Sequence, residues 1–421
     1  MERRYKESGI KEIGIIPEDW NLSRLKFVLE SPVETGKRPN EPEGNVLSVG
    51  GEHIQNGKFD LSHPIYVSKT TFDENKGKIQ LHDTLVVKDG ATIGKCMYVT
   101  SMPQEKMLLN EHVYRINCSK FYYYWILSEI SQQWFRVRNQ STAQESITGP
   151  TIMNLPIVNM DKTEQSRIVD YLDEKCSEIN SLIELQEKMI ENLKAYKQSV
   201  ITEAVTKGIN PNIKLVSSEI DWIDKIPEGW NTIRIKHLLK ERKERSESGE
   251  EEPLSMSQKY GLIPTKDMDM IPNMASSFVG AKIVYTSDLV FNKLKAHLGV
   301  FSVSKYYGLV SPDYAVYYST GRANLKFLEY LFKTPQCIGE FRKRSTGVGA
   351  GLTRLYTNDL YSILIPFPSL SEQEAIASYL DGKCSEIDNL VVIKQQKIEK
   401  LKDYKKSIIY EAVTGKINID S

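Results

Sequence analysis

The sequence predicts an α/β protein in which two α/β domains are separated by two long helices that form an antiparallel coiled coil. Three observations predict this fold: a long internal repeat, two segments with a heptad pattern of apolar residues, and short strand-like runs between the repeated blocks. We expect a pseudo-two-fold chain with a domain over 1–160, a helix over 161–208, a second domain over 209–370 and a second helix over 371–421.

Length and composition are those of a soluble folded protein. The 421 residues can form two domains that each bury a core, and hydrophobic residues make up 40% and charged residues 26% of the chain. No apolar run approaches the ~20 residues of a membrane span, and the polar N-terminus lacks the apolar stretch of a secretory signal. We therefore expect a cytoplasmic protein with no membrane-embedded part.

Cysteine usage and net charge narrow the function classes. Five cysteines, an odd number without C-x-x-C spacing, argue against a disulfide framework and against a zinc site. Lys plus Arg equals Asp plus Glu at 55 each, so net charge gives no support to nucleic-acid binding. Any contact with DNA must come from local basic patches.

The internal repeat fixes the architecture. Residues Ile16 to Asn21 return as Ile226 to Asn231 with one difference, at an offset of 210 (226 minus 16). Further matches are Arg24 and Lys26 with Arg234 and Lys236, Glu164-Gln165 with Glu372-Gln373, Tyr171-Leu172-Asp173 with Tyr379-Leu380-Asp381, and Lys175–Ile179 with Lys383–Ile387. Residues 30–150 and 240–360, the two inserts, share little sequence. A duplicated frame with different inserts is expected when one scaffold presents two recognition modules; plain duplication of a scaffold is the alternative.

Two long helices are predicted over 164–206 and 372–414, preceded by prolines and followed by Gly208 and Gly415. One heptad position holds Leu172, Ile179, Leu193 and Val200 in the first helix and Leu380, Ile387, Leu401 and Ile408 in the second, and another holds Leu182, Met189 and Tyr196, and Leu390 and Tyr404. Because an exposed apolar seam is unstable in water, we expect the helices to pair; packing of each on its own domain is the alternative. The seams are interrupted near their middles by Gln186, Lys394 and Lys397, which antiparallel pairing would bring together.

The inserts combine strands, turns and helices. In the first, Thr84–Val87, an Asp-Gly turn at Asp89-Gly90, and strand-like runs at 92–95 and 97–99 predict a hairpin, followed by a helix near Phe121 to Arg136. In the second, strands are predicted over 288–293 and 309–316, and a helix over 324–332. Both inserts are therefore predicted to be compact α/β units.

Local basic runs occupy matching places in the inserts. Both are Arg-rich and end in Ser-Thr: they are Arg136, Arg138, Asn139, Gln140, Ser141 and Thr142, and Arg342, Lys343, Arg344, Ser345 and Thr346. Arg and Lys contact phosphates and pair with guanine, whereas Asn and Gln pair with adenine. A short basic run is often only a solvated face, but its recurrence favours DNA contact. Further candidates near predicted turns, with a solubilising role as the alternative, are Lys88, Lys95, Lys293, Lys295 and His297.

Motifs for catalysis are missing. The run from Gly90 to Cys96 resembles a phosphate loop, but it is one residue short between the glycines and has Cys where the magnesium-binding Ser or Thr should be. The six histidines are scattered without metal-ligand spacing. No nucleophile elbow and no dinucleotide fingerprint is found. These observations favour a binding protein over an enzyme.

The repeated Ile-Pro-x-x-Trp opening, the Glu-Gln that begins each helix after a proline, and the Ala-Val-Thr ending before Gly208 or Gly415 resemble the specificity subunit (HsdS, S subunit) of type I restriction-modification systems. The resemblance spans nearly the whole chain. It implies a non-catalytic, sequence-specific DNA-binding subunit whose inserts are target-recognition domains, each contacting one half of a bipartite asymmetric target, and whose helices form a spacer.

The resemblance also implies partners. These are double-stranded DNA, methylase subunits, expected to be two, and nuclease or translocase subunits. S-adenosylmethionine, ATP and Mg would be bound by the partner subunits, and this chain would bind no cofactor and no metal. Two alternatives stay open: the recognition subunit of a related system whose methylase and nuclease are fused, and a coiled-coil scaffold without a nucleic-acid function.

Overall fold

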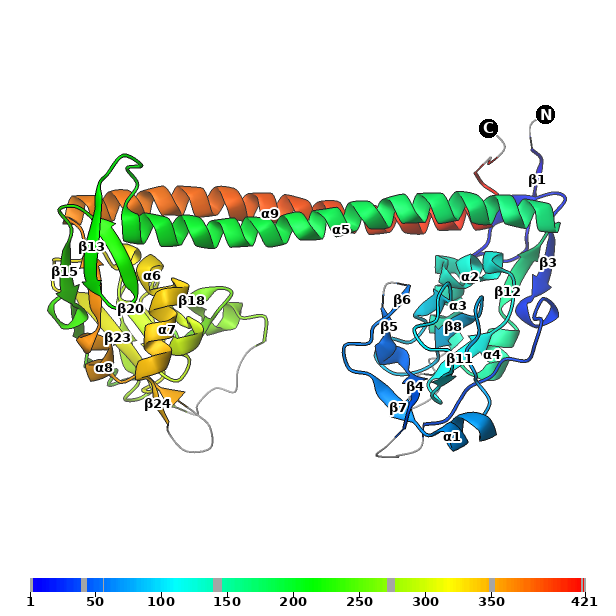
Figure 1. The fold of residues 1–421 in the computed structure, drawn as a ribbon, viewed down its shortest axis with the longest axis horizontal. Helices are drawn as coiled ribbons and strands as arrows, with labels where there is room; N and C mark the ends of the chain where they lie inside the picture. Colours follow the sequence, from blue (N-terminus) through cyan, green and yellow to red (C-terminus); the bar gives the residue numbers. More distant parts are fainter. Residues whose placement is uncertain are drawn as a thin grey trace. The chain divides into compact units, whose positions relative to one another are not determined.

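Residues 3–38, 44–55, 57–138, 146–270, 277–347, 353–417 and 419 are described by the computed structural model (Figure 1). The chain divides into two units, the first made of residues 1–187 and 396–421 and the second of residues 188–395. Each unit thus contains one insert together with part of both long helices. Among the described residues, none of the helices combines the length and the hydropathy of a membrane span.

The insert of the first unit holds two three-stranded sheets. Their strands, in spatial order, are β10 (Met107–Leu109), β4 (Val46–Val49) and β7 (Ile65–Val67), and β11 (Val113–Ile116), β8 (Thr84–Val87) and β9 (Cys96–Tyr98). The other strand pairs are β1 (Tyr5–Glu7) with β2 (Ile15–Pro17), β3 (Asn21–Arg24) with β12 (Pro156–Asn159), and β5 (Ile54–Gln55) with β6 (Lys58–Phe59). The helices are α1 (Lys69–Glu74), α2 (Lys120–Leu127), α3 (Glu129–Arg138), α4 (Gly149–Met153) and the single 3-10 turns η1 (Leu25–Phe27) and η2 (Gly51–His53). All four residues of β8 are buried, because this central strand is covered on both faces.

The second unit repeats the strand pairs of the frame, but the sheets of its insert differ in strand number. Its largest sheet has four strands in the order β16 (Leu239–Glu241), β23 (Tyr314–Ser319), β20 (Leu289–Asn292) and β21 (Phe301–Val303). The other pairs are β13 (Leu215–Ile220) with β14 (Ile223–Pro227), β15 (Asn231–Arg234) with β26 (Leu364–Phe367), β17 (Leu254–Ser257) with β18 (Gly261–Pro264), β19 (Lys282–Val284) with β22 (Gly308–Val310), and β24 (Thr346–Gly347) with β25 (Thr353–Arg354). The helices are α6 (Leu325–Phe332), α7 (Pro335–Arg344), α8 (Thr357–Ser362) and the 3-10 turns η3 (Ile235–His237), η4 (Thr265–Asp267) and η5 (Ala296–Leu298).

The two long helices, α5 (Lys162–Lys207) and α9 (Leu370–Val413), pack side by side (Figure 1). In the second unit, Lys197 Nζ lies 2.6 Å from Asp388 Oδ2, and Lys394 Nζ lies 3.2 Å from Met189 Sδ. The residue number falls along α5 as it rises along α9, so the helices are antiparallel. The predicted antiparallel pairing is confirmed.

The first unit contains the matching contact. Lys405 Nζ donates to Asn180 Oδ1 at 2.9 Å. Lys405 corresponds to Lys197, and Asn180 to Asp388, at the repeat offset of 208 (405 minus 197 and 388 minus 180). Equivalent lysines therefore connect the two long helices in both units.

One of the two predicted seam positions is wrong. Leu182, Met189, Tyr196, Leu390 and Tyr404 are 38 to 58% exposed. The buried residues of the second position come one residue later, at Cys176, Ile190, Cys384 and Ile398, whereas the first position is buried as predicted at Leu172, Ile179, Leu380, Ile387 and Ile408. On a helix, the residue three places after a seam residue points about 60° to one side of it, and the residue four places after points about 40° to the other side. Here the partner helix covers the side of the residue four places after. Gln186 is buried in the first unit; its meeting with Lys394 and Lys397 stays a prediction.

The repeated frame residues make the same contacts in both units. The hydroxyl of Tyr124 in α2 donates to Asp173 at 2.6 Å, and the hydroxyl of Tyr330 in α6 donates to Asp381 at 2.6 Å. In each unit the first helix after the sheet is thereby tied to a long helix. The repeated Tyr-Leu-Asp motif therefore reflects the docking of the insert on the coiled coil.

The inserts share a skeleton that their sequences do not reveal. Asp83 and Asp288 are both buried, precede the central strands β8 and β20, and are 205 residues apart (288 minus 83). Each accepts a hydrogen bond from an arginine Nε, of Arg115 at 2.7 Å or Arg242 at 2.8 Å. Each also accepts from the backbone N–H three residues earlier. One buried carboxylate thus anchors the central strand of both inserts.

Several local predictions need correction. The hairpin of β8 and β9 is confirmed, but residues 88–95 form one wide loop instead of a two-residue Asp-Gly turn with a strand after it, because Gly94 N bonds Val87 O at 2.8 Å. The helix predicted near Phe121 to Arg136 is two helices, interrupted at Ser128. The strand predicted over 309–316 is two strands, because Pro312 cannot donate to a sheet. The strand and helix predicted over 288–293 and 324–332 are confirmed as β20 and α6.

Candidate nucleic-acid interface

The loop after the central strand has the same construction in both inserts. Lys88 directly follows β8, and Lys293 directly follows β20. Each loop ends at a glycine with a left-handed backbone, Gly94 (φ 80°) or Gly299 (φ 76°), a conformation that other residues rarely adopt. The two lysines, predicted to contact DNA, therefore stand at equivalent positions of the two units.

A second segment runs beside each of these loops. Ile147 N donates to Lys88 O at 2.7 Å, and Leu355 N donates to Lys293 O at 3.0 Å. In the sequence, Ile147 comes shortly after the Arg-rich end of α3, and Leu355 comes shortly after that of α7. In each unit, the loop after the central strand is thus joined by a backbone hydrogen bond to a segment that comes later in the chain.

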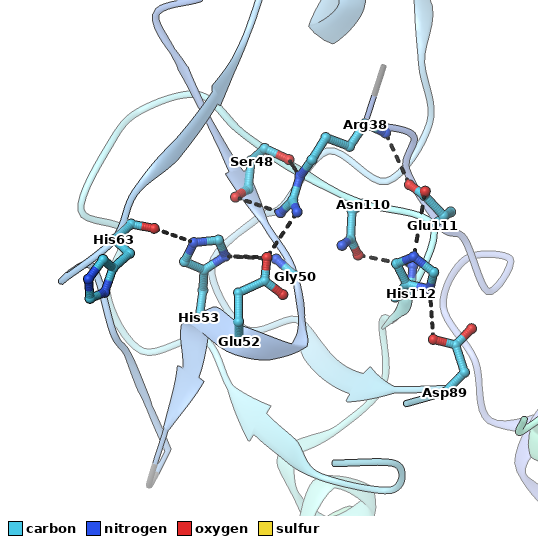
Figure 2. Close-up of polar contacts among 10 residues, drawn as sticks. All are labelled: Arg38, Ser48, Gly50, Glu52, His53, His63, Asp89, Asn110, Glu111 and His112. Carbon is cyan, nitrogen blue, oxygen red and sulfur yellow. Dashed lines mark hydrogen bonds and ion pairs between the residues drawn. The ribbon is translucent and has the colours of Figure 1, made fainter. Parts of the chain in front are cut away.

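In the first unit, the side chain of Arg38 connects strand β4 with neighbouring loops (Figure 2). Its guanidinium donates to Ser48 Oγ at 2.9 Å and to Glu52 Oε1 at 2.9 Å, and its backbone N–H donates to Glu111 Oε2 at 3.1 Å. Burial raises the pKa of Glu52, but its own backbone N–H and the Arg38 ion pair outweigh this effect and hold the pKa below its usual value. Glu52 is therefore ionised at neutral pH.

The network continues to the loop that contains Lys88. His112 Nδ1 lies 2.7 Å from Asp89 Oδ1, and His112 Nε2 lies 3.6 Å from Glu111 Oε1 (Figure 2). The ammonium of Lys88 lies over the ring of Tyr114, 5.6 Å from its centroid. The loops after β4, β8 and β10 are thus held together, and they present both donors and acceptors, as base recognition requires.

In the second unit, the equivalent loop lies in a more basic environment. Lys293 is half-buried, and desolvation, followed by the charge of Lys282 and then that of Arg354, lowers its pKa. Lys282 is itself buried and contacts Glu241 Oε1 at 3.2 Å. The charges of Glu241 and Asp313, which pair with Lys282 and Arg354, oppose this lowering of the pKa of Lys293 but do not outweigh it.

The hairpin of β24 and β25 borders this loop. Thr353 Oγ1 lies 3.4 Å from His297 Nδ1, and Arg354 Nη2 donates to Asp313 Oδ1 at 3.1 Å. Arg354 Nε is buried without a hydrogen-bond partner in the described structure. Lys293, His297 and the end of the second basic run therefore lie in one region.

The Arg-rich helix ends differ between the units. Arg136 is exposed and pairs with Glu129, whereas Arg138 lies over the ring of Trp134, 3.1 Å from its centroid. Asn139, Gln140, Ser141 and Thr142 lie outside the described residues.

At the end of α7, the buried Glu340 pairs with Lys343 at 2.8 Å and with Arg344. Arg342 and Thr346 are exposed, and Ser345 Oγ caps the helix by donating to Phe341 O at 2.7 Å. Much of the positive charge of this run is thus neutralised within the helix.

The two remaining predicted lysines lie at the edges of these regions. Lys95 Nζ donates to Gln55 Oε1 at 2.8 Å, and Lys295 is exposed. The sequence did not single out Arg38, Lys282 or Arg354. Each is an isolated basic residue whose neighbours come from distant segments, so only the tertiary structure identifies it.

The site offers no ready place for a metal ion. Among the described residues, no group of three or more His, Cys, Asp or Glu side chains is arranged to hold one. All five cysteines are buried and unpaired.

The two α/β inserts thus have a common skeleton, and each carries basic and polar loops after its central strand. Comparisons with known proteins add to this description. Residues 17–195 match the family model described as the type I restriction modification DNA specificity domain. The type I restriction enzyme MjaVIII specificity subunit of Methanocaldococcus jannaschii is 24% identical to this chain, over 99% of this chain and 97% of its own length. The sequence named for the MjaX specificity subunit of the same organism is 26% identical, over 99% of this chain and 98% of its own length.

Solved structures have the same fold. A chain from the structure reported as the basis of complex assembly and conformational transition of the type I R-M system superposes with a TM-score of 0.71 over 96% of this chain and 99% of that one, at 16% identity. The HsdS subunit from Thermoanaerobacter tengcongensis gives a TM-score of 0.52 over 96% and 98%, also at 16% identity. The chain is thus similar over nearly its whole length to specificity subunits of type I restriction-modification systems, and residues 17–195 match the DNA specificity domain of these systems.

Proposed function

We propose that each unit recognises one half of a bipartite, asymmetric DNA target and that the chain directs methylase and nuclease subunits to it. One observation carries this proposal: the loops after β8 and β20 have the same construction but different side chains. The first begins Lys88-Asp89-Gly90 and the second Lys293-Leu294-Lys295. Because base specificity depends on the donors and acceptors presented, equivalent loops with different side chains should bind different sequences.

The chain supplies recognition, and its partners supply the reactions. Donor and acceptor groups are present in both regions, but a catalytic constellation was not predicted from the sequence. We expect S-adenosylmethionine, ATP and Mg to be bound by the methylase and nuclease subunits. We expect the whole assembly to be cytoplasmic.

The long helices offer a surface for these partners. In the first unit Leu182 and Leu185 are exposed on α5, and in the second unit Val392 and Ile393 are exposed on α9. Large apolar side chains that gather on a solvated helix mark a protein interface. We assign these positions to contacts with methylase subunits, expected to be two because the frame is duplicated.

Methylation mapping tests this function. DNA from cells that carry this chain with its methylase should be modified at a motif of two dissimilar half-sites separated by unspecified bases. A continuous motif or a perfect palindrome would contradict the proposal. A scaffold without a nucleic-acid function would show no salt-sensitive DNA binding even with the methylase present.

A further inference from the structure

A basic hollow lies where the frame of the first unit meets the end of α3. It has a volume of about 590 Å³, and its lining includes Arg24, Lys26, Trp134, Arg138, Thr151 and Asn154. The described residues that line it supply three cations and no acid. The lining is therefore positively charged although the net charge of the chain is zero.

Among the described residues, no acidic side chain pairs with the cations of this hollow. No ion pair in the described part of the chain involves Arg24, Lys26 or Arg138. Arg24 Nη1 makes only a long hydrogen bond, of 3.5 Å, to Asn154 Oδ1, and Arg138 is stacked on Trp134. The stack holds a guanidinium in place and leaves its N–H groups available.

The second unit has the same frame with an acid added. Arg24 and Arg234 each lie opposite the first residue of the partner strand, β12 or β26. These residues are Pro156 and Leu364. Thr151 lies five residues before Pro156, and Asp359 lies five residues before Leu364 (156 minus 5 and 364 minus 5). An acidic side chain thus replaces a neutral one at the equivalent place.

The helix that borders the site carries a second acid. α3 and α7 both end in Phe-Arg-x-Arg, and the residue before this motif is Trp134 in α3 and Glu340 in α7. Arg138 therefore stacks on a ring where Arg344 pairs with a buried carboxylate. Arg234, the counterpart of Arg24, also donates to a backbone carbonyl, Ser362 O, at 2.7 Å. Two counterparts of the open cations, Arg234 and Arg344, are thus engaged in the second unit.

We propose that the hollow of the first unit binds a phosphate of the DNA backbone and that the equivalent place in the second unit does not. Like charges held together without a counter-ion repel each other, so an anion is the ligand that stabilises the hollow. Guanidinium and ammonium groups are the usual donors to DNA phosphates. The source of this anion follows from the chain itself, because Arg138 directly precedes residues 139–142, the segment predicted to contact DNA.

This inference rests on the proposed DNA-binding function and adds a one-sided contact to it. Phosphate contacts position a duplex but carry no sequence information. The site should therefore contribute equally to the binding of specific and unrelated duplexes. It should also leave the methylated motif unchanged.

The test measures the affinity of the complex of the full chain with its methylase for target and unrelated duplexes across a range of salt. The double variant R24A/K26A should reduce the slope of log K against log salt by about 2, because each lost phosphate contact contributes ~0.9. At ~0.1 M salt, this corresponds to a loss of affinity of about 8-fold per contact on both duplexes. The matched control R234A/K236A should lose less than a third as much.

A variant that removes no basic group separates charge from folding. T151D introduces the acid that the second unit has, in the first turn of α4, where an acidic residue is favourable for the helix. It should lower the affinity about 8-fold with an unchanged melting temperature. The reciprocal D359T should raise the affinity by up to the same factor.

Three results would overturn the inference: unchanged slopes in R24A/K26A and T151D, an equal loss in R234A/K236A, or loss of methylase co-purification with the DNA affinity of the remaining complex unchanged. The last result would assign the hollow to an acidic segment of the methylase. If the unsubstituted complex itself does not bind DNA, the proposed function fails, and this outcome is distinct from failure of the hollow alone.

Discussion

A fragment that ends near Gly208 should dimerise and rebuild the architecture of the full chain. In the first unit, α9 buries four apolar residues against the insert and α5, namely Ile408, Ile409, Ala412 and Val413. At an offset of 208, α5 itself carries Val200, Ile201, Ala204 and Val205. Three of these four are identical, so a second copy of α5 can take the place of α9.

The structure gives the size of the defect. Ile408 is replaced by Val200, which removes one buried methylene at each end of the symmetric dimer and costs about 1 kcal/mol per site. The contact of Lys405 with Asn180 becomes an equivalent contact of Lys197. A loss of about 2 kcal/mol corresponds to about a 30-fold weaker dimer. In the fragment, V200I should restore most of this loss, whereas V200A should weaken the dimer further.

Sedimentation of the fragment co-expressed with the methylase measures association, and methylation mapping measures specificity. A two-fold dimer of identical modules should modify a symmetric motif, composed of the first half-site, a gap and the same half-site inverted. The reasoning is refuted if the fragment is folded and methylase-bound but remains monomeric, or if it still modifies the original asymmetric motif.

Three further predictions concern the spacer, the second half-site and acid stability. Insertion of a few residues between Ile190 and Tyr196 should lengthen the unspecified gap, with half-site centres starting about 34 to 36 Å apart; methylation mapping would contradict this if a half-site changed while the gap stayed constant. K293A should reduce base discrimination by about 1–3 kcal/mol in one half-site only; binding assays with duplexes altered in either half-site show whether both are affected. Burial raises the pKa of Glu329, but two lysine ion pairs outweigh it, so the folded pKa lies below the usual 4.5. This group therefore stabilises the fold above pH ~4.5 and loses its contribution as the pH falls through the lowered pKa. Urea unfolding should show a lower free energy of unfolding for E329Q than for the unsubstituted chain at pH 7, and this difference should close in acid. A difference that is independent of pH would count against the ion pairs.

The sequence predicts the frame well because its signals are local or repeated. Heptad spacing and the duplicated motifs around Asp173 and Asp381 are enough to define the two helices and their pairing. The second seam position cannot be chosen in this way. In α5, the residues three and four places after the seam residue Ile179 are both apolar, namely Leu182 and Ile183. Only the position of α9 decides which of them is less exposed.

The candidate site is less accessible to sequence reasoning because its contacts are long-range. Arg38 and Glu111 are 73 residues apart, and Arg115 and Asp83 are 32 apart. The common skeleton of the inserts depends on buried aspartates and strand register, which tolerate different residues elsewhere. Lys88 and Lys293 could be proposed as separate candidates, but their equivalence requires the structure.

The structure separates what is duplicated from what differs. Buried contacts of the frame, such as Tyr124 with Asp173 and Tyr330 with Asp381, recur because both inserts must dock on the coiled coil in the same way. Exposed loops and the basic hollow are not under this constraint, since a substitution such as Thr151 for Asp359 changes charge without changing a buried contact. A duplicated frame of this kind allows one module to change its sequence preference while the other module and the pairing of the helices stay intact.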